Sequence, residues 1–161
     1  SSIAYQQLAG KAAATIWGRV LDAVGRPFTP ERVLSTDPAA LRAAGLSGAK
    51  TAALVDLAAK SADGTVRLAR IGAMTNHDVI EHLTVVRGIG PWTAQMFLLF
   101  RLGRPDLLPD LDLAIQKAVQ LAYRLRKRPT PERVRKIGAK WAPYRSVATW
   151  YLWRSLDAPT A

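Results

Sequence analysis

A five-residue break, Arg87-Gly88-Ile89-Gly90-Pro91, separates two apolar stretches near the middle of the chain. Gly88 can adopt a positive φ at no steric cost, and neither glycine has a side chain that would keep a ligand away from the backbone. A helix that begins at Pro91 would add its first amides and the positive end of its dipole, and together these groups suit a phosphate oxygen. The same residues equally fit an ordinary turn between two helices, capped by glycine and closed by an inward-packed Ile89.

The chain has a large excess of positive charge, with 23 Lys and Arg residues, 12 Asp and Glu residues and a formal net charge of +11. Between residues 117 and 145 the only acid is Glu132, and the basic residues are Lys117, Arg124, Arg126, Lys127, Arg128, Arg133, Arg135, Lys136, Lys140 and Arg145. A solvated helical face would explain them in a protein of balanced charge, but this asymmetry favours a polyanion as partner. A membrane surface fits less well, because no expected helix combines a basic face with an exposed apolar one.

Residue types exclude several kinds of chemistry. The chain contains no cysteine, which excludes disulfides, a thiolate nucleophile and cysteine-ligated metals. His77 and His82 have no convincing third ligand nearby, so we expect no metal site built from side chains. The apolar run WTAQMFLLF stops at Arg101 and is too short to span a bilayer. No signal-peptide pattern is visible, and the chain starts at Ser1 as if a helix were already under way, so we expect residues upstream.

Helix signals recur along the chain and strand signals almost never do, so we expect an all-α fold with short loops. Capping oxygens directly precede prolines at Thr29, Asp37 and Thr130, and Thr75 with Asp78 forms a weaker, box-like cap. Glycines stand where helices should stop, at Gly25, Gly45, Gly64, Gly88 and Gly103. The expected helices lie near residues 2–24, 30–35, 38–44, 48–62, 76–86, 91–102, 112–126, 131–141 and 144–156, with a short one near 66–72 as an option.

The last expected helix carries apolar residues at the spacing of a buried stripe. The stripe consists of Tyr144, Val147, Ala148, Tyr151 and Leu152. Trp150 and Trp153 fall beside it, toward its edge. Tryptophans in such positions either pack against the core or line a pocket, and the spacing leaves both interpretations open.

Four segments of the chain carry motifs: LTVVRGIGPWTA, LLPDLDLAIQKAV, AYQQLAGKAA and WAPYRSVATWYLWR. The first resembles the hairpin of the helix–hairpin–helix (HhH-GPD) DNA glycosylase superfamily, and the second resembles the segment that carries its catalytic aspartate. The third and fourth are similar to the Gln-Gln turn and the tryptophan-rich helix of the superfamily's alkyl-purine branch. The four segments follow the family's order and span nearly the whole chain. They are most similar to the 3-methyladenine DNA glycosylase II (AlkA-like) branch.

The resemblance implies that Asp112 is the catalytic carboxylate. Relatives often have two adjacent aspartates, whereas here Leu111 fills the first of those positions and Asp110 precedes it. Matching forward from residues 113–115 aligns Asp112 with the catalyst and leaves Asp110 as the alternative. By residue type alone, either aspartate is explained as the N-cap of the next helix, and capping and catalysis can coexist.

The resemblance also implies which residues meet the base and the DNA. An alkylated purine is positively charged, so stacking on aromatic rings would select it once it is flipped out of the duplex. Trp92 and Trp153 match positions that line the aromatic pocket, and the weaker candidates are Tyr144, Trp150 and Met96. Core packing is the competing interpretation for each, and the better one for Met96. The implied DNA-binding residues are Gln6, Gln7, Arg87, Gly88, Ile89, Gly90 and Thr93.

The hairpin of this family also binds a monovalent cation through backbone carbonyls, which implies a Na⁺ or K⁺ near Gly88 and Gly90. No other cofactor is implied. Relatives of the endonuclease III type, which also cut the strand, carry a lysine where this chain has Trp92, so we expect no lyase activity.

We therefore expect a monofunctional glycosylase of base excision repair that removes 3-methyladenine or 7-methylguanine from double-stranded DNA. It would act as a monomer, away from membranes, in the bacterial cytoplasm (nucleoid) or the eukaryotic nucleus. One domain, residues 1–161, would form a larger lobe to about residue 107, which contains the hairpin, and a smaller lobe over 108–161, with a cleft between them. A non-catalytic DNA-binding module, and a glycosylase for other damaged or mismatched bases, remain alternatives.

Overall fold

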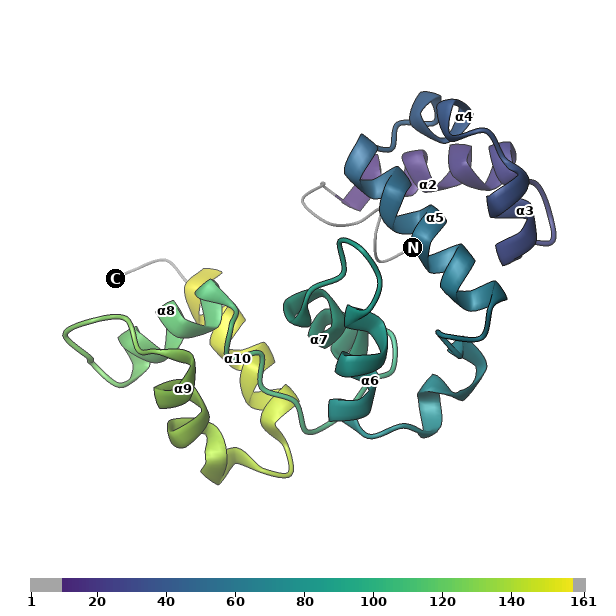
Figure 1. Cartoon of the computed structure of the whole chain (residues 1–161). Helices are drawn as coiled ribbons and strands as arrows, with labels where there is room; N and C mark the ends of the chain where they lie inside the picture. The colour runs from purple at the N-terminus through teal and green to yellow at the C-terminus, as the bar shows by residue number, and fades with distance from the viewer. Residues whose placement is uncertain (1–9, 158–161) are drawn as a thin grey trace. The chain divides into compact units, whose positions relative to one another are not determined.

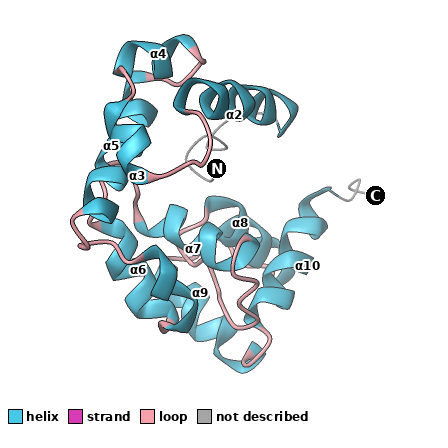
Figure 2. Ribbon diagram, turned by 90° about the vertical axis from the view of Figure 1, so that its right-hand side faces the viewer, coloured by secondary structure: helices cyan, strands magenta, loops and turns pink. Residues whose placement is uncertain are grey.

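The computed structural model describes residues 10–157, which consist of helices and loops (Figure 2). The first helices are α2 (Gly10–Val24), α3 (Pro30–Ser35), α4 (Pro38–Ala43), α5 (Gly48–Ala62), the 3-10 helix η1 (Leu68–Ala73), α6 (Asn76–Thr84) and α7 (Pro91–Phe100). They are followed by α8 (Leu113–Ala122), α9 (Pro131–Gly138), the 3-10 helix η2 (Ala139–Trp141) and α10 (Arg145–Asp157). The expected all-α class is confirmed. None of the described helices is both long and apolar enough for a bilayer crossing.

The chain divides into two compact units, residues 1–94 and 95–161, and the division falls inside α7. In the first unit, α5 packs against α3 and α4, and α2 packs against α4 (Figure 1). The core of this unit consists of Val20, Val24, Val33, Leu41, Ala44, Leu46, Leu54 and Ala58. The expectation of a single domain, with lobes that divide near residue 107 and a cleft between them, stays a prediction.

In the second unit, α8 packs against α9 and α10 (Figure 1). Its core consists of Leu108, Ile115, Val119 and Val134. Gly138, at the end of α9, lies so close to the loop before α8 that a methyl group there would overlap the Leu108 side chain. Leu108 lies only four residues before Asp112, the residue that caps α8. Contact between α9 and Leu108 therefore helps to hold the start of α8 in place.

The expected helix caps are present. The side chains of Thr29, Asp37 and Thr130 accept backbone N–H groups of their helices at 3.4, 2.8 and 3.3 Å. Thr75 and Asp78 form a complete capping box. Each glycine that was expected to stop a helix has a positive φ. Local signals in the sequence therefore locate most helix boundaries.

Some helices end earlier than the sequence indicates. α6 ends at Thr84, α7 at Phe100 and α8 at Ala122, whereas their ends were expected near residues 86, 102 and 126. For α8 the reason is local: Arg124, not a glycine, adopts the positive φ of 51° at which the helix stops. The optional helix near 66–72 is a 3-10 helix, η1.

The buried side of α10 differs from the expected stripe, which was wrong for Tyr144, Val147 and Tyr151. Tyr144 and Tyr151 are each 65% exposed. Thr149 is fully buried instead, because its hydroxyl donates to the Arg145 carbonyl at 2.8 Å, with the Leu107 carbonyl as a second acceptor at 3.3 Å. A hydrogen-bonded hydroxyl can be buried at little cost. The inward side is therefore turned around the helix axis by about one residue, to Thr149, Leu152 and Trp153.

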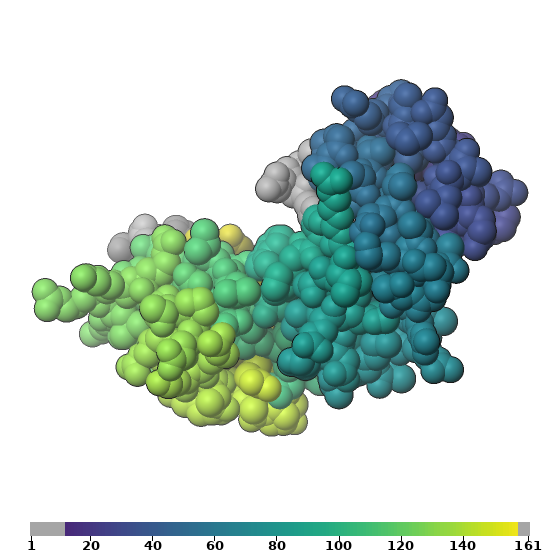
Figure 3. Space-filling model, viewed as in Figure 1, coloured from purple at the N-terminus to yellow at the C-terminus, as the bar shows by residue number. Residues whose placement is uncertain are grey.

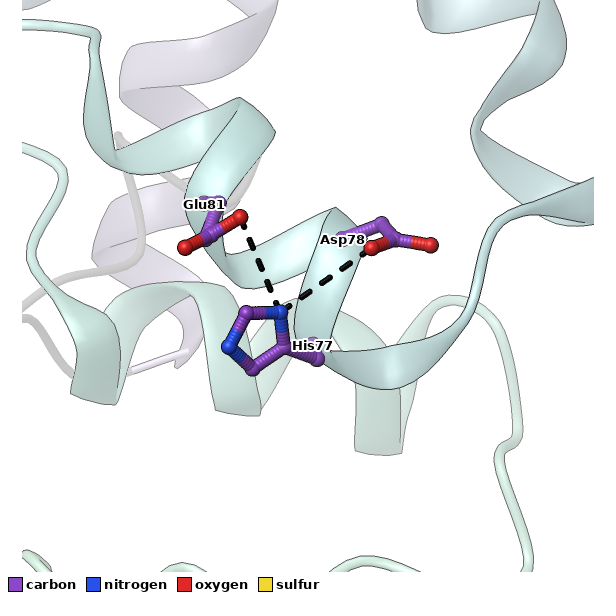
Figure 4. Close-up of side chains that lie close together, drawn as sticks. All are labelled: His77, Asp78 and Glu81. Atoms are coloured by element: carbon purple, nitrogen blue, oxygen red, sulfur yellow. Dashed lines mark ion pairs between the residues drawn. The ribbon is translucent and has the colours of Figure 1, made fainter.

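The two histidines have separate roles. The Arg67 backbone N–H donates to His82 Nε2 at 2.7 Å and joins α6 to the loop before η1. His77 is exposed at the start of α6, with its Nδ1 3.9 Å from Asp78 and 3.6 Å from Glu81 (Figure 4). We interpret this group as polar contacts at an exposed helix end, since Asp78 already serves the capping box. The expectation of no side-chain metal site stays a prediction.

Candidate functional site

The turn between α6 and α7 presents bare backbone. Gly88 is exposed at φ 79°, and a Cβ there would lie 3.3 Å from Cβ of Ala53. At Gly90, no atom of residues 10–157, apart from the adjacent residues in the chain, lies within 4 Å of where a Cβ would be. Ile89 is buried, and its N–H donates to the Val86 carbonyl at 3.1 Å. Ile89 thus anchors the turn, as expected. Both glycines are exposed, and the side-chain position of Gly90 is open to close approach, whereas that of Gly88 faces Ala53.

Asp56 of α5 also anchors this turn. Its Oδ2 accepts the Arg87 backbone N–H at 2.7 Å, and Lys60 donates to Oδ1 at 2.6 Å and to Oδ2 at 2.7 Å. The hydrogen bond from Lys60, followed by that from the Arg87 amide, holds the pKa of Asp56 below its ordinary value. Sequence reasoning missed this role, because Asp56 and Lys60 look like a common i, i+4 helix pair.

Asp112 is the N-cap of α8 and is only 8% exposed. Its Oδ1 accepts the Ile115 backbone N–H at 2.9 Å and the Trp153 indole N–H at 3.4 Å. The positive end of the α8 dipole lies at the same point and stabilises negative charge. These groups fix the orientation of the carboxylate, so capping is compatible with a chemical role.

Trp153 connects Asp112 to a second aromatic ring. It stacks on Phe100, with ring centroids 5.8 Å apart and 16° between the planes. Phe100 is 71% exposed, although it is large and apolar. Trp153 itself is half-buried and packs against the core of the second unit. An aromatic pair with one exposed ring beside a fixed carboxylate suits a planar ligand that carries positive charge.

Phe100 was not among the residues that the sequence singled out. It ends a strongly apolar helix, which is typical of a packing residue. The signal that could have found it is spacing: Trp92, Met96 and Phe100 follow one another at intervals of four residues on α7.

Asp110 lies in a different environment from Asp112. It is 6% exposed, its Oδ1 accepts the Gln95 amide at 3.4 Å, and its Oδ2 pairs with Arg135. Its backbone carbonyl accepts the Gln116 amide at 2.9 Å. Both carboxylate oxygens are therefore engaged in holding the turn before α8, which favours a structural role for Asp110.

The loop before α8 is held by the start of α10. Nε and Nη2 of Arg145 donate to the two oxygens of Asp106 at 2.6 and 2.7 Å. This pairing lowers the pKa of Asp106 and raises that of Arg145. Ser146 donates from Oγ to the Arg104 carbonyl at 2.6 Å. The Arg-Ser pair of the WAPYRS motif therefore positions this loop.

The other predicted residues are more dispersed. Trp92 is exposed in the first turn of α7, and Thr93 and Met96 on the same helix are half-buried. Tyr144 is exposed directly before α10. Their contacts with base or DNA stay predictions. Those of Gln6 and Gln7 do too, because both residues lie outside the described part of the chain.

Comparison with known families identifies the chain. A family model described as "HhH-GPD superfamily base excision DNA repair protein" matches residues 1–144. The chain belongs to the HhH-GPD superfamily. The superfamily and the helical fold inferred from the four motifs are therefore confirmed.

Individual HhH-GPD proteins extend the similarity. The chain is 34% identical to the putative DNA-3-methyladenine glycosylase YfjP of Bacillus subtilis, over 96% of this chain and 56% of the relative. It is 36% identical to DNA-3-methyladenine glycosylase 1 of Schizosaccharomyces pombe, over 96% of this chain and 69% of the relative. The solved structure of the S. pombe 3-methyladenine DNA glycosylase Mag1 in complex with abasic DNA matches with a TM-score of 0.80 and 35% identity. That match covers 98% of this chain and 78% of Mag1. The chain thus spans little more than half the length of the Bacillus relative.

Proposed function

We propose that this HhH-GPD protein is a monofunctional DNA glycosylase that hydrolyses the N-glycosidic bond of alkylated bases such as 3-methyladenine and 7-methylguanine. The observation that carries the proposal is the carboxylate of Asp112, fixed at the start of α8 beside the Trp153–Phe100 stack. Two relatives that are named as DNA-3-methyladenine glycosylases support this class of substrate.

Cleavage of an N-glycosidic bond leaves the sugar with oxocarbenium-like positive charge, while the base departs with the bonding electrons. The Asp112 carboxylate stabilises that charge, and it orients the attacking water or accepts its proton. Because the Ile115 and Trp153 N–H groups already hold Oδ1, the negative charge needs no rearrangement as the bond breaks. The products are a free base and an abasic site with an intact backbone.

The aromatic pair explains the choice of base. The target must leave the duplex to be reached, and an alkylated purine then presents a flat, positively charged ring. Stacking on Trp153 and Phe100 binds such a ring more strongly than a neutral one through cation–π attraction. The positive charge also makes the base a good leaving group. Trp92, Met96 and Tyr144 are proposed as further contacts to the base.

Double-stranded DNA is the proposed partner, bound by a single copy of the chain. The turn at Gly88 and Gly90 would contact a phosphate through backbone amides, with Arg87 and Thr93 beside it. We also propose that backbone carbonyls of this turn bind Na⁺ or K⁺. The Gly90 carbonyl accepts the Ala94 N–H at 3.1 Å and keeps a second lone pair, which could bind the cation. A cation there would add positive charge next to the phosphate. We expect the protein to lie with the chromosome, in a nucleoid or a nucleus.

Strand cleavage by a glycosylase requires an amine that forms a Schiff base with the sugar. Trp92 occupies the hairpin position at which strand-cutting relatives carry their lysine, so we propose hydrolysis by water alone. Incubation with alkylated DNA and borohydride should trap no covalent protein–DNA adduct. A trapped adduct, or strand breaks without added alkali, would contradict this part of the proposal.

Release of free base from methylated duplex DNA tests the proposed function. Chromatography of the supernatant should identify 3-methyladenine or 7-methylguanine. Binding to abasic-site DNA without release of any base from alkylated, oxidised or mismatched duplexes would indicate a non-catalytic module. Release of oxidised or mismatched bases only would indicate a different substrate class.

A further inference from the structure

The end of α8 has an unusual residue at its stop position. The Leu125 N–H donates to the Gln120 carbonyl at 2.9 Å, and the Arg124 N–H donates to the Leu121 carbonyl at 3.1 Å. This pair of hydrogen bonds is the Schellman motif, whose penultimate residue has a positive φ and is usually glycine. Here that residue is Arg124, at φ 51°. Among residues 10–157 it is the one non-glycine residue with positive φ.

A side chain in this conformation is strained, and glycine would remove the strain. Strain of this kind is a reason to look for a function of the residue that bears it. The feature that arginine adds here is a positive charge on an exposed side chain. The strain at this position therefore indicates that the positive charge of Arg124 has a function.

The α8–α9 loop, residues 123–130, carries further basic side chains that are exposed to solvent. Leu125 packs against the core of the second unit, and Pro129 is buried. Between these two anchors, Arg126, Lys127 and Arg128 are exposed. Figure 3 shows this segment, in green, projecting from the surface of its unit. The loop thus presents its charges from a fixed base.

The basic residues between 117 and 145 fall into two groups. One group has partners inside the unit: Arg135 with Asp110, Arg145 with Asp106, Lys136 with Glu132, and Lys140 over the Tyr123 ring. The other group forms no ion pair with any residue in the described part of the chain: Lys117, Arg124, Arg126, Lys127, Arg128 and Arg133. Most of this second group lies in the α8–α9 loop. These charges are therefore not used in ion pairs among residues 10–157.

We propose that the α8–α9 loop is a second duplex-binding surface, separate from the glycine hairpin, which contacts DNA phosphates beside the lesion through Arg124, Arg126, Lys127 and Arg128. This inference rests on the proposed function, since duplex DNA is the polyanion concerned. α8 separates the loop from Asp112 by ten residues, or about 15 Å of helix. At 3.4 Å per nucleotide, the loop reaches phosphates within about five base pairs of the target.

The decisive variant is Arg124→Gly, which removes the charge and the strain together. It should melt at a higher temperature than the wild type and yet bind duplex DNA more weakly. Loss of one phosphate contact lowers the log–log slope of affinity against salt by about 0.9, which is about an 8-fold loss of affinity at 0.1 M salt. Arg124→Lys keeps both charge and strain and should keep the slope. A joint change of Arg126, Lys127 and Arg128 to Gln should lower the slope by about 2.7.

Binding is measured by fluorescence anisotropy on duplexes that carry an abasic-site analogue and extend about ten base pairs to each side, beyond the reach of the loop. Arg42→Gln, an exposed cation on α4, controls for net charge and should leave the slope unchanged. The inference is overturned if Arg124→Gly gains thermal stability with no change in slope, or if Arg42→Gln lowers the slope equally. Release of methylated base by the unaltered protein is measured separately. If the unaltered protein releases base and the loop variants leave the salt slope unchanged, only the DNA-binding role of the loop is refuted. If the protein releases no base, the proposed glycosylase activity is refuted, and the comparison of binding slopes still tests the role of the loop.

Discussion

Gly138→Ala should destabilise the protein, although alanine favours helices more than glycine does. Gly138 is the last residue of α9, with a φ of −79° that any residue can adopt. A Cβ there would overlap Cδ2 of Leu108 and lie 2.9 Å from Cε3 of Trp141. Overpacking of a core costs about 1–3 kcal/mol, whereas the gain in helix propensity is at most about 1 kcal/mol. Even with the full gain subtracted, we expect a net loss of up to about 2 kcal/mol.

Gly18→Ala is the matched control. Gly18 lies in the interior of α2, and outside the backbone of that helix no described residue has an atom within 4 Å of where its Cβ would be. The same substitution should stabilise the protein there by about 0.5–1 kcal/mol. Urea unfolding followed by circular dichroism measures both changes in the free energy of unfolding. If Gly138→Ala were as stabilising as Gly18→Ala, the close packing of α9 on the loop before α8 would be refuted.

Three further predictions concern the site and the turn beside it. Asp56→Asn should lower the free energy of unfolding near neutral pH, because Asp56 anchors the turn between α6 and α7 as a carboxylate. Since the folded-state pKa of Asp56 is lowered, the loss relative to wild type is complete above about pH 4 and shrinks as the pH falls through that lowered pKa. A loss that grew on acidification would contradict the role of Asp56 as an anchor. Gly88→Val should weaken binding to all duplex sequences alike, because the turn contacts phosphate and not bases, and a loss confined to one sequence in anisotropy titrations would count against this. Trp153→Phe keeps a ring and removes the N–H at Asp112, so it should slow single-turnover base release by about 5-fold, whereas Trp153→Ala should impair cationic bases more than neutral ones. Equal losses on both types of base, with a lowered melting temperature, would indicate core packing instead.

The sequence predicted the features that local chemistry encodes. A capping oxygen directly before a proline indicates the start of a helix at Thr29, Asp37 and Thr130. A glycine indicates the turn at Gly88, because only glycine adopts its φ easily. The end of α8 was predicted four residues too late because it lacks this signal: Arg124, not a glycine, adopts the positive φ at which the helix stops.

Features that depend on tertiary contacts were less visible. Asp56 hydrogen-bonds a backbone amide 31 residues away, and the fit of Gly138 against Leu108 joins α9 to a distant loop. The buried side of α10 was wrong because Thr149 satisfies its hydroxyl inside the fold, which apolar spacing cannot indicate. Asp112 was located through its motif, and only the structure shows that it shares a contact with Trp153.

The central claim is that Asp112 performs the chemistry, and the most direct measurement compares base release by Asp112→Asn with that of the wild type. Asparagine caps a helix about as well as aspartate, so the variant removes the charge and keeps the fold. We predict that release of methylated base falls by at least about 100-fold, while binding to abasic-site DNA stays unchanged. Asp110→Asn, measured in parallel, should retain release and lose stability, since that carboxylate pairs with Arg135. Near-normal release by Asp112→Asn, together with loss of release in Asp110→Asn, would contradict the account and move the catalyst to Asp110.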